Sequence, residues 1–362
     1  MNVNRVLEVR DGNATRAVQS FLSALWQEHE LDALLAPATK SEQTGVSAQV
    51  IRHPEKLAAV DPFTPVMQGN SAAAAWRFIQ EETSGRLAVL LRPCELRALV
   101  ELSKRASSSA SPFPARDADA EKCVLVIGVD CLGTYTQQEF LSAGAGHGSD
   151  EITRLTLQNA SQGGLIPQPF RTACQVCEWP APRGADIVIG TLGVDTEKTL
   201  LVLACDECLD SRLHLTGITD GPAAEYLVSR RETVVGAIAD ARLGYRRNLY
   251  EELGSEGRFS DLGSILAWFA NCNLCGKCLK ACPIYGGELD SLLGREKSRS
   301  PLADLVLLSH WIASCSGCGM CEEVCARDVP LMLLISGLSH RIWEEMHYNA
   351  GDLTQKLPWT CN

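Results

Sequence analysis

Eight cysteines in the C-terminal third of the chain follow one spacing twice. In CNLCGKCLKAC and in CSGCGMCEEVC, three cysteines recur at intervals of three residues and a fourth comes four residues later. This spacing wraps a compact turn around an inorganic cubane, and thiolates are the soft ligands that iron-sulfur clusters require. The sequence therefore predicts two [4Fe-4S] clusters, with zinc sites or buried free thiols as the alternatives. The predicted ligands are Cys272, Cys275, Cys278 and Cys282 in the first run and Cys315, Cys318, Cys321 and Cys325 in the second.

The fourth cysteine of each run is expected to serve the other cluster, as it does in two-cluster ferredoxins. Cys325 would then complete the first set, and Cys282 would complete the second. Gly276, Gly317 and Gly319 lack a Cβ atom, so the backbone N–H groups of these turns can approach the sulfur atoms closely. The exchange would tie both runs into one folding unit.

The charged residues beside the two runs differ in sign. Lys277 and Lys280 lie in the first run, whereas Glu322 and Glu323 lie in the second. Positive charge favours the reduced, more negative cluster. We therefore expect the cluster of the first run to have the higher reduction potential.

The segments between and after the two runs are expected to be helical. Residues 303–314 and 329–346 have the length and apolar content of helices. The module therefore resembles the all-helical ferredoxin domain of succinate dehydrogenase iron-sulfur subunits and of the small heterodisulfide reductase subunit. Ala326 follows the second run, where the first run is followed by Pro283.

The larger N-terminal part has an α/β pattern, because short apolar runs alternate with helical stretches. We place the boundary within residues 244–262, where mixed charge and glycine occur together. The prediction is an α/β domain over 1–250 and a smaller all-α ferredoxin-like domain over 251–362. The expected elements are a helix over 14–35, a strand, turn and helix over 86–102, strands within 123–131, 185–194 and 199–207, and loops over 107–121 and 143–151.

Four further cysteines are candidates for a third cluster. Cys94 and Cys131 each follow a predicted strand, and ligands collect at the carboxyl ends of strands in open α/β sheets. Cys174 and Cys177 form a tight pair just before another strand. The alternatives are a zinc site at this pair, ordinary buried thiols, or ligands drawn instead from the rival pair Cys205 and Cys208.

The order of the N-terminal motifs resembles the β-subunit family of coenzyme F420-reducing hydrogenase and F420-dependent formate dehydrogenase. The motifs are RPCEL, VIGVDC, CQVCEWP and ADIVIGTLG, and the resemblance covers about residues 15–245. It implies that Cys94, Cys131, Cys174 and Cys177 bind a third [4Fe-4S] cluster and that the α/β domain binds FAD. The chain departs from the family pattern at Glu95, Asp130 and Trp179 and in the GTLG segment, which leaves the carrier open.

Two segments are candidates for contact with the flavin, although the chain has no G-x-G-x-x-G motif. Gln68, Gly69, Asn70 and Ser71 precede a helix, where free N–H groups favour phosphate; the alternative is an ordinary helix cap. Gly190, Thr191 and Gly193 end a strand and could approach a flavin closely; the alternative is a glycine-bearing turn.

Net charge and hydropathy indicate which partners and which location to expect for the protein. The formal net charge of −11 disfavours nucleic acid as a partner. The chain has no apolar run of about 18 residues and no hydrophobic signal core, so we expect a cytoplasmic protein without a direct membrane span.

We expect an oxidoreductase subunit that is active only in a complex with other redox subunits. It would pass electrons between its clusters and a two-electron carrier, which could be F420, NAD(P)H or a partner such as formate dehydrogenase or hydrogenase. The alternative is a flavin-free adaptor that links a dehydrogenase or hydrogenase to a heterodisulfide-reductase-like module. A nucleophilic cysteine enzyme built on Cys94 is a weaker option, because no matching His and Asp arrangement accompanies that residue.

Overall fold

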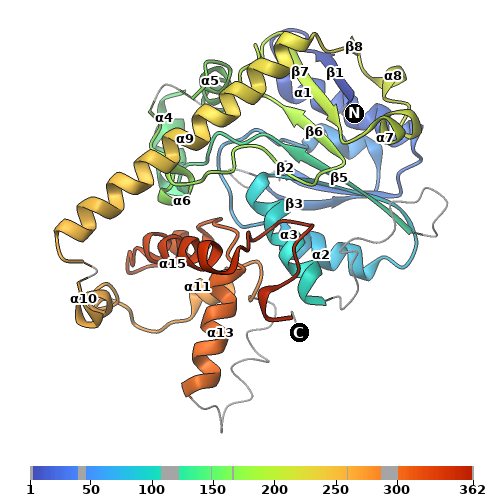
Figure 1. Ribbon diagram of the computed structural model, residues 1–362. Coiled ribbons are helices and arrows are strands. Elements are labelled where there is room, and N and C mark those ends of the chain that lie inside the picture. Colours follow the sequence, from blue (N-terminus) through green and yellow to red (C-terminus); the bar gives the residue numbers. More distant parts are fainter. Residues whose placement is uncertain are drawn as a thin grey trace.

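The computed structural model describes residues 3–39, 46–106, 122–147, 149–164, 167–258, 260–286 and 301–360. An α/β part and a smaller helical part lie against each other, and the long helix α9 runs from the first to the second (Figure 1). The strands are β1 (Val3–Glu8), β2 (Ala33–Thr39), β3 (Val46–Ile51), β4 (Gly85–Leu91), β5 (Lys122–Val129), β6 (Ile187–Gly190), β7 (Thr199–Ala204) and β8 (Gly221–Pro222). The helices are α1 (Ala14–Glu28), η1 (Pro54–Ala59), α2 (Ala72–Glu81), α3 (Pro93–Ala106), α4 (Gln137–His147), α5 (Ser149–Ser161), α6 (Thr172–Gln175), α7 (Glu207–Arg212), α8 (Leu215–Ile218), α9 (Glu225–Ser255), α10 (Leu262–Ala267), α11 (Lys277–Lys280), α13 (Pro301–Ala313), α14 (Met320–Glu323), α15 (Leu331–Met346) and η2 (Pro358–Thr360).

The strands form one mixed sheet in the order β3-β2-β4-β5-β6-β7-β1-β8. Strands β2, β4, β5 and β6 are parallel, while β3 and β7 pair antiparallel to their neighbours β2 and β6. Because β4, β5 and β6 run in one direction, their carboxyl ends share one edge of the sheet. The segments that follow β4 and β5 carry Cys94 and Cys131 to this edge.

The central strands are apolar on both faces because helices cover both sides of the sheet. Leu90 and Ile127 pack on the face that α1 covers, and both side chains are fully buried. Val89 and Leu91 point to the opposite face, where Leu99 of α3 packs against them. This two-sided burial explains why residues 87–91 and 123–129 read as continuous apolar runs.

Two sequence-based expectations about the α/β part need correction. The helix expected over 14–35 ends at Glu28, because residues 33–39 instead form β2 and pair with β4. The loop expected over 143–151 is helical on both sides of residue 148, since α4 reaches His147 and α5 begins at Ser149. Buried Phe140 anchors α4, and this packing outweighs the low helix propensity of its glycines. The loop expected over 107–121 lies outside the described residues.

The two helices expected before and after the second cysteine run are present as α13 and α15, which confirms this prediction. Helix α9 crosses residue 250, so the proposed domain boundary falls inside a continuous helix. Tyr250 of α9 donates a hydrogen bond to the backbone oxygen of Leu333 in α15. Beyond α15 the chain returns to α3, where the hydroxyl group of Tyr348 donates to Glu101 over 2.6 Å.

Candidate metal centres

The two ferredoxin-type runs fold into the same turn. The backbone N–H of Leu274 points at Cys272 Sγ over 3.4 Å, and the N–H of Gly317 points at Cys315 Sγ over the same distance. Leu274 and Gly317 occupy equivalent positions and both have left-handed backbone, with φ of 57° and 69°. Backbone donors therefore face the sulfur atoms in both runs, from a glycine in the second run and from a leucine in the first.

The sulfurs of the first set lie near the surface of the helical part. Burial raises the pKa of Cys278, and the neighbouring thiols of Cys325 and Cys272 add to the rise. Cys272 and Cys275 are exposed. The structure thus brings Cys325, the last cysteine of the second run, to the first set, in the arrangement that the exchange predicts.

The sulfurs of the second set lie deeper. Burial raises the pKa of Cys315 to about 12, with Cys318 and Cys282 adding to the rise. Burial also raises the pKa of Cys321 well above the ordinary value, and Cys318, Cys315 and Cys282 add to the rise. Cys282, the last cysteine of the first run, therefore lies with the second set. Thiols packed this closely resist ionisation on their own, whereas bound metal deprotonates them outright.

The four N-terminal cysteines come together at the carboxyl edge of the sheet. Cys94 is the second residue of α3, which follows β4, Cys131 follows β5, and Cys174 and Cys177 lie in and after α6. Burial raises the pKa of Cys131 to about 11, and the thiols of Cys174 and Cys177 add to the rise. Burial also raises the pKa of Cys94, with Cys131 and Cys177 among the contributing groups. Four soft donors from three segments form one group, which fits a cubane and leaves its binding as a prediction.

The N-terminal set adjoins the second set. Cys318 is buried in a small apolar cluster with Met67 and Met320, and Cys94 packs against this cluster. Cys318 also contributes to the raised pKa of Cys94 after burial and Glu95. Sulfurs from chain segments more than 200 residues apart therefore share one buried region.

A buried arginine lies beside the N-terminal set. Arg171 donates from Nε to Thr134 Oγ1 over 2.9 Å, and its two terminal nitrogens face the sulfur atoms of Met320 and Met67 over 3.3 and 3.4 Å. Burial acts to raise the pKa of Cys174, but the charge of Arg171 and hydrogen bonds from Thr134 lower it below the ordinary value. The site therefore favours a thiolate at Cys174. No motif or residue spacing in the sequence marks this arginine or its partners as part of the site.

The rival cysteines lie at the other edge of the sheet. Strand β7 is antiparallel to β6, so its last residue, Ala204, lies opposite Ile187 at the start of β6. Cys205 follows directly and donates its backbone N–H to Asp186 over 3.0 Å. Cys205 and Cys208 are both exposed. The structure does not bring this pair to the N-terminal set.

The strand-end turn expected to contact flavin is covered by α9. A Cβ atom on Gly190 would lie 2.8 Å from Arg231 Nε, and one on Gly193 would lie 2.9 Å from Val234 Cγ2. The N–H of Thr191 donates to Asp130 Oδ2 over 3.0 Å. This geometry is that of the alternative, a glycine-bearing turn packed against a helix.

The segment before α2 is also engaged within the protein. Both the N–H and the hydroxyl group of Ser71 donate to Glu95 Oε1, over 3.1 and 2.7 Å. Asn70 Oδ1 accepts a 2.9 Å hydrogen bond from the N–H of Ala72, while Gln68 and Gly69 are exposed. Ser71, the N-cap residue of α2, makes no side-chain cap hydrogen bond to the helix, so its polar groups serve Glu95 instead. The donors that could hold a flavin phosphate already have a carboxylate.

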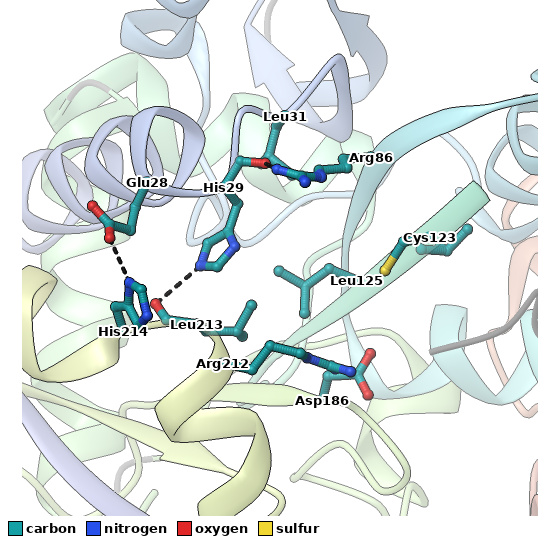
Figure 2. Close-up of a pocket in the computed structure, with 11 residues that line it drawn as sticks. Glu28, His29, Leu31, Arg86, Cys123, Leu125, Asp186, Arg212, Leu213 and His214 are labelled. Atoms are coloured by element: carbon teal, nitrogen blue, oxygen red, sulfur yellow. Dashed lines mark hydrogen bonds and ion pairs between the residues drawn. The ribbon is translucent and has the colours of Figure 1, made fainter. Parts of the chain in front are cut away.

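A cavity of about 210 Å³ lies at the edge of the sheet opposite the three thiol sets. Figure 2 shows its lining, which includes Cys123, Arg212 and Asp186. The His29 ring nitrogen Nε2 bonds to the carbonyl oxygen of Leu213 over 2.9 Å. Because β5 separates this edge from Cys131, the cavity takes no part in the N-terminal set.

Two features are absent from the described residues: a site for a single metal ion and a helix that could span a membrane. No group of three or more His, Cys, Asp or Glu side chains converges on one position suited to a single metal ion. Sulfurs that hold a cubane bind different iron atoms, so they are not expected to converge on one point. Among the described helices, none combines the length and apolar character needed to cross a membrane.

Comparison with known proteins identifies two segments. Residues 84–214 match the family described as the C terminus of the coenzyme F420 hydrogenase/dehydrogenase beta subunit, and residues 268–329 match the 4Fe-4S dicluster domain. Among solved structures, the chain is similar to a chain of the F420-reducing [NiFe] hydrogenase complex from Methanosarcina barkeri. That match has 12% sequence identity and a TM-score of 0.44, and it covers 68% of this chain and 91% of that chain.

Proposed function

Because residues 84–214 belong to the beta-subunit family of coenzyme F420 hydrogenase/dehydrogenase and residues 268–329 form a 4Fe-4S dicluster domain, we propose that this iron-sulfur chain is an electron-transfer subunit with three [4Fe-4S] clusters. Cys272, Cys275, Cys278 and Cys325 would hold one cluster, Cys315, Cys318, Cys321 and Cys282 the second, and Cys94, Cys131, Cys174 and Cys177 the third. The clusters supply one-electron carriage, and the protein supplies ligands and electrostatics.

The order of the thiol sets supports a relay. The first set reaches the surface, where Cys272 and Cys275 are exposed and the Leu274 side chain between them is 90% exposed. The second set is interior, and its Cys318 adjoins Cys94 of the N-terminal set. The packing of Cys94 against the buried cluster that contains Cys318 is the observation on which the proposal rests. A partner redox subunit would exchange electrons at the exposed first set.

The flavin-free form of this function is favoured by two carboxylates. Glu95 and Asp130 are positions at which the chain departs from the family pattern. Glu95 accepts hydrogen bonds from Ser71, and Asp130 accepts one from the N–H of Thr191. A flavin diphosphate beside Glu95 would meet a carboxylate of like charge, and Asp130, which is paired with Arg231, already holds the turn N–H that a diphosphate would need. The subunit would then be an adaptor that links a dehydrogenase or hydrogenase to another redox module.

The family match favours one competing candidate, a flavin-containing subunit that exchanges a hydride with F420 or NAD(P)H. A flavin accepts two electrons at once and releases them singly, which would connect such a carrier to the clusters. This candidate requires about one flavin per chain, whereas the adaptor requires none.

Anaerobic purification followed by iron, sulfide, zinc and flavin quantification tests these proposals. We expect about 12 iron atoms per chain, because three cubanes hold four each, and no flavin. Cys94→Ser should lower the iron content to about eight, as expected for loss of one cubane. Cys208→Ser is the matched control, because this exposed cysteine lies at the other sheet edge. About eight iron atoms in the unaltered protein would refute the third cluster, and stoichiometric flavin would favour the hydride-exchanging subunit.

A further inference from the structure

A second buried arginine, Arg97, has no carboxylate among its hydrogen-bond partners in the described part of the chain. The residue lies on α3 and is 7% exposed. Its Nε donates to the carbonyl oxygen of Ala350 over 3.1 Å, and its Nη1 donates to that of Ser316 over 2.9 Å. Within the same described residues, Nη2 is buried without a hydrogen-bond partner. Burial of a charge is costly unless an opposite charge compensates it, so this guanidinium requires nearby negative charge.

Glu101, a carboxyl group close to Arg97 on the same helix, is engaged elsewhere. Glu101 lies one helical turn further along α3 and is fully buried. It accepts hydrogen bonds from the Tyr348 hydroxyl group and from Lys104 Nζ over 2.6 and 3.0 Å. The compensating charge for Arg97 must therefore come largely from other groups.

Two tryptophan rings hold the guanidinium in place. Arg97 Cζ lies 4.9 Å from the ring centre of Trp179 and 5.5 Å from that of Trp343. Trp179 follows Cys177 by two residues, and Trp343 belongs to α15 of the helical part. Contact with aromatic faces stabilises a desolvated cation without neutralising it. The position of the charge is therefore fixed between the two parts of the chain.

Arg97 adjoins thiols from two different sets, because its side chain lines one small cavity together with Cys177 and Cys315. Burial lowers the pKa of Arg97, and Cys177, Cys315 and Cys94 are the first three groups that oppose this effect. Cys177 and Cys94 belong to the N-terminal set, whereas Cys315 belongs to the second set. Arg171 lies in a similar position, with Nη2 3.9 Å from Cys174 Sγ, and against the effect of burial Cys94 and Cys318 also help to raise its pKa. Two buried cations therefore lie where the two sets adjoin.

We propose that Arg97 is a cation shared by the two clusters and raises the reduction potential of both. The inference rests on the proposed function, because it requires clusters at both thiol sets. Reduction adds one electron, and thus one negative charge, to a cluster. A fixed positive charge in a buried region favours that reduced state and is little screened by salt. Arg97 is thus a positioning and tuning residue that makes the interior pair of clusters the preferred site for electrons.

The position of Arg97 also changes the order of reduction potentials that is expected from the charged residues beside the two cysteine runs. Lys277 and Lys280 beside the first set are exposed, so solvent and salt screen their charges. We therefore expect Lys277→Glu to shift the potential of the first-set cluster less than Arg97→Gln shifts the two interior clusters. The interior clusters, and not the cluster of the first run, would then have the higher potentials.

An EPR-monitored redox titration of the anaerobically purified full chain, with dithionite as reductant, tests the proposal. Arg97→Gln should lower the midpoint potentials of two of the three clusters by at least a tenfold change in each reduction equilibrium, which is 59 mV for one electron. Arg97→Lys should restore most of the shift, because it keeps the charge. Arg183→Gln is the matched control, since Arg183 stacks on the same Trp179 ring at 4.5 Å but is exposed. The midpoint potentials of the clusters in Arg183→Gln should equal those in the unaltered protein.

Three results would overturn the proposal, and they can be told apart. Unchanged potentials in Arg97→Gln with about 12 iron atoms would refute the role of Arg97 and leave the three-cluster function intact. If Arg97→Gln loses iron, Arg97→Lys is used instead and is compared with Arg171→Gln, in which a full charge is removed. A shift of the midpoint potentials in Arg97→Lys as large as that in Arg171→Gln would refute a role for charge at position 97. About eight iron atoms in the unaltered protein would refute the proposed function first, before any variant is compared.

Discussion

The indole Nε1 of Trp311 on α13 donates a hydrogen bond to Cys282 Sγ over 3.3 Å. Cys282 ends the first cysteine run but lies among the sulfurs of the second set. The Trp311 ring also packs edge-on against Tyr285, with ring centres 6.4 Å apart. The tryptophan therefore combines a packing contact with a polar contact to one sulfur atom. These two contributions can be separated by substitution.

Trp311→Phe should lower the reduction potential of the cluster that Cys282 binds. The substitution removes the donor to sulfur and keeps an aromatic ring against Tyr285, and hydrogen bonds to sulfur stabilise the reduced cluster. A redox titration followed by EPR measures the shift. Trp268→Phe is the control, because the Trp268 indole donates to the backbone oxygen of Arg258 and not to sulfur. An equal shift in both variants would show that the Cys282 contact has no special effect.

Gly319→Ala should destabilise the junction between the two parts more than Gly276→Ala does. The two glycines occupy equivalent positions and have nearly the same backbone, with φ of 71° and 70°. A Cβ atom on Gly319 would lie 2.3 Å from Ala173 Cβ, whereas one on Gly276 would meet open space. Both variants bear the left-handed strain of about 1–2 kcal/mol, and Gly319→Ala adds overpacking of about 1–3 kcal/mol.

Denaturant unfolding under anaerobic conditions compares the two glycine variants. The difference between their midpoints isolates the clash with Ala173, because the backbone strain is common to both. Ala173 precedes Cys174, so Gly319→Ala should also reduce the iron bound by the N-terminal set. Equal midpoints and equal iron contents would contradict the close contact at this junction.

The parts of the structure that could be predicted depend on local patterns. Residues 87–91 and 123–129 form strands because apolar side chains cover both of their faces, and this requirement is visible along the chain. The grouping of Cys282 with the second run could be expected because the ligand spacing of two-cluster ferredoxins implies it. Such features need no knowledge of distant contacts.

The contacts that the sequence could not reveal join distant segments. Arg97 and Ser316 are separated by 219 positions, and no motif marks either residue as part of the site. The place of Cys205 depends on the antiparallel direction of β7, whereas an alternating α/β pattern suggests a parallel strand. The turn at residues 190–193 has the composition of a ligand loop, but α9 occupies the space beside it.

Asp130→Asn should destabilise the fold by about 3 kcal/mol, because removing one partner of a buried ion pair leaves the other charge uncompensated. Asp130 is fully buried, and its Oδ2 accepts from Arg231 Nε over 2.8 Å and from the N–H of Thr191. Denaturant midpoints measure the loss. Arg154→Ala is the control, since its pair with Glu151 is exposed and should contribute nothing measurable. A midpoint for Asp130→Asn equal to that of the control would contradict this account.

The cavity at the opposite sheet edge predicts a pH dependence of stability through His29 (Figure 2). Burial lowers the pKa of His29 below its ordinary value of 6.5 in spite of the hydrogen bond to Leu213. The folded protein therefore takes up a proton at this residue less readily than the unfolded chain. The stability contributed by His29 is complete above about pH 6.5 and is lost as the pH falls below that value.

His29→Asn should reduce the loss of stability on acidification, because asparagine does not titrate. Denaturant unfolding at a series of pH values on both sides of about 6.5, run in parallel on the unaltered protein and the variant, measures the effect. Acid sensitivity of the clusters is common to both proteins, so the difference between the two curves reports on residue 29. His53→Asn, at an exposed position before η1, should leave the curve unchanged. A His29→Asn curve parallel to that of the unaltered protein would show that His29 is not the group responsible.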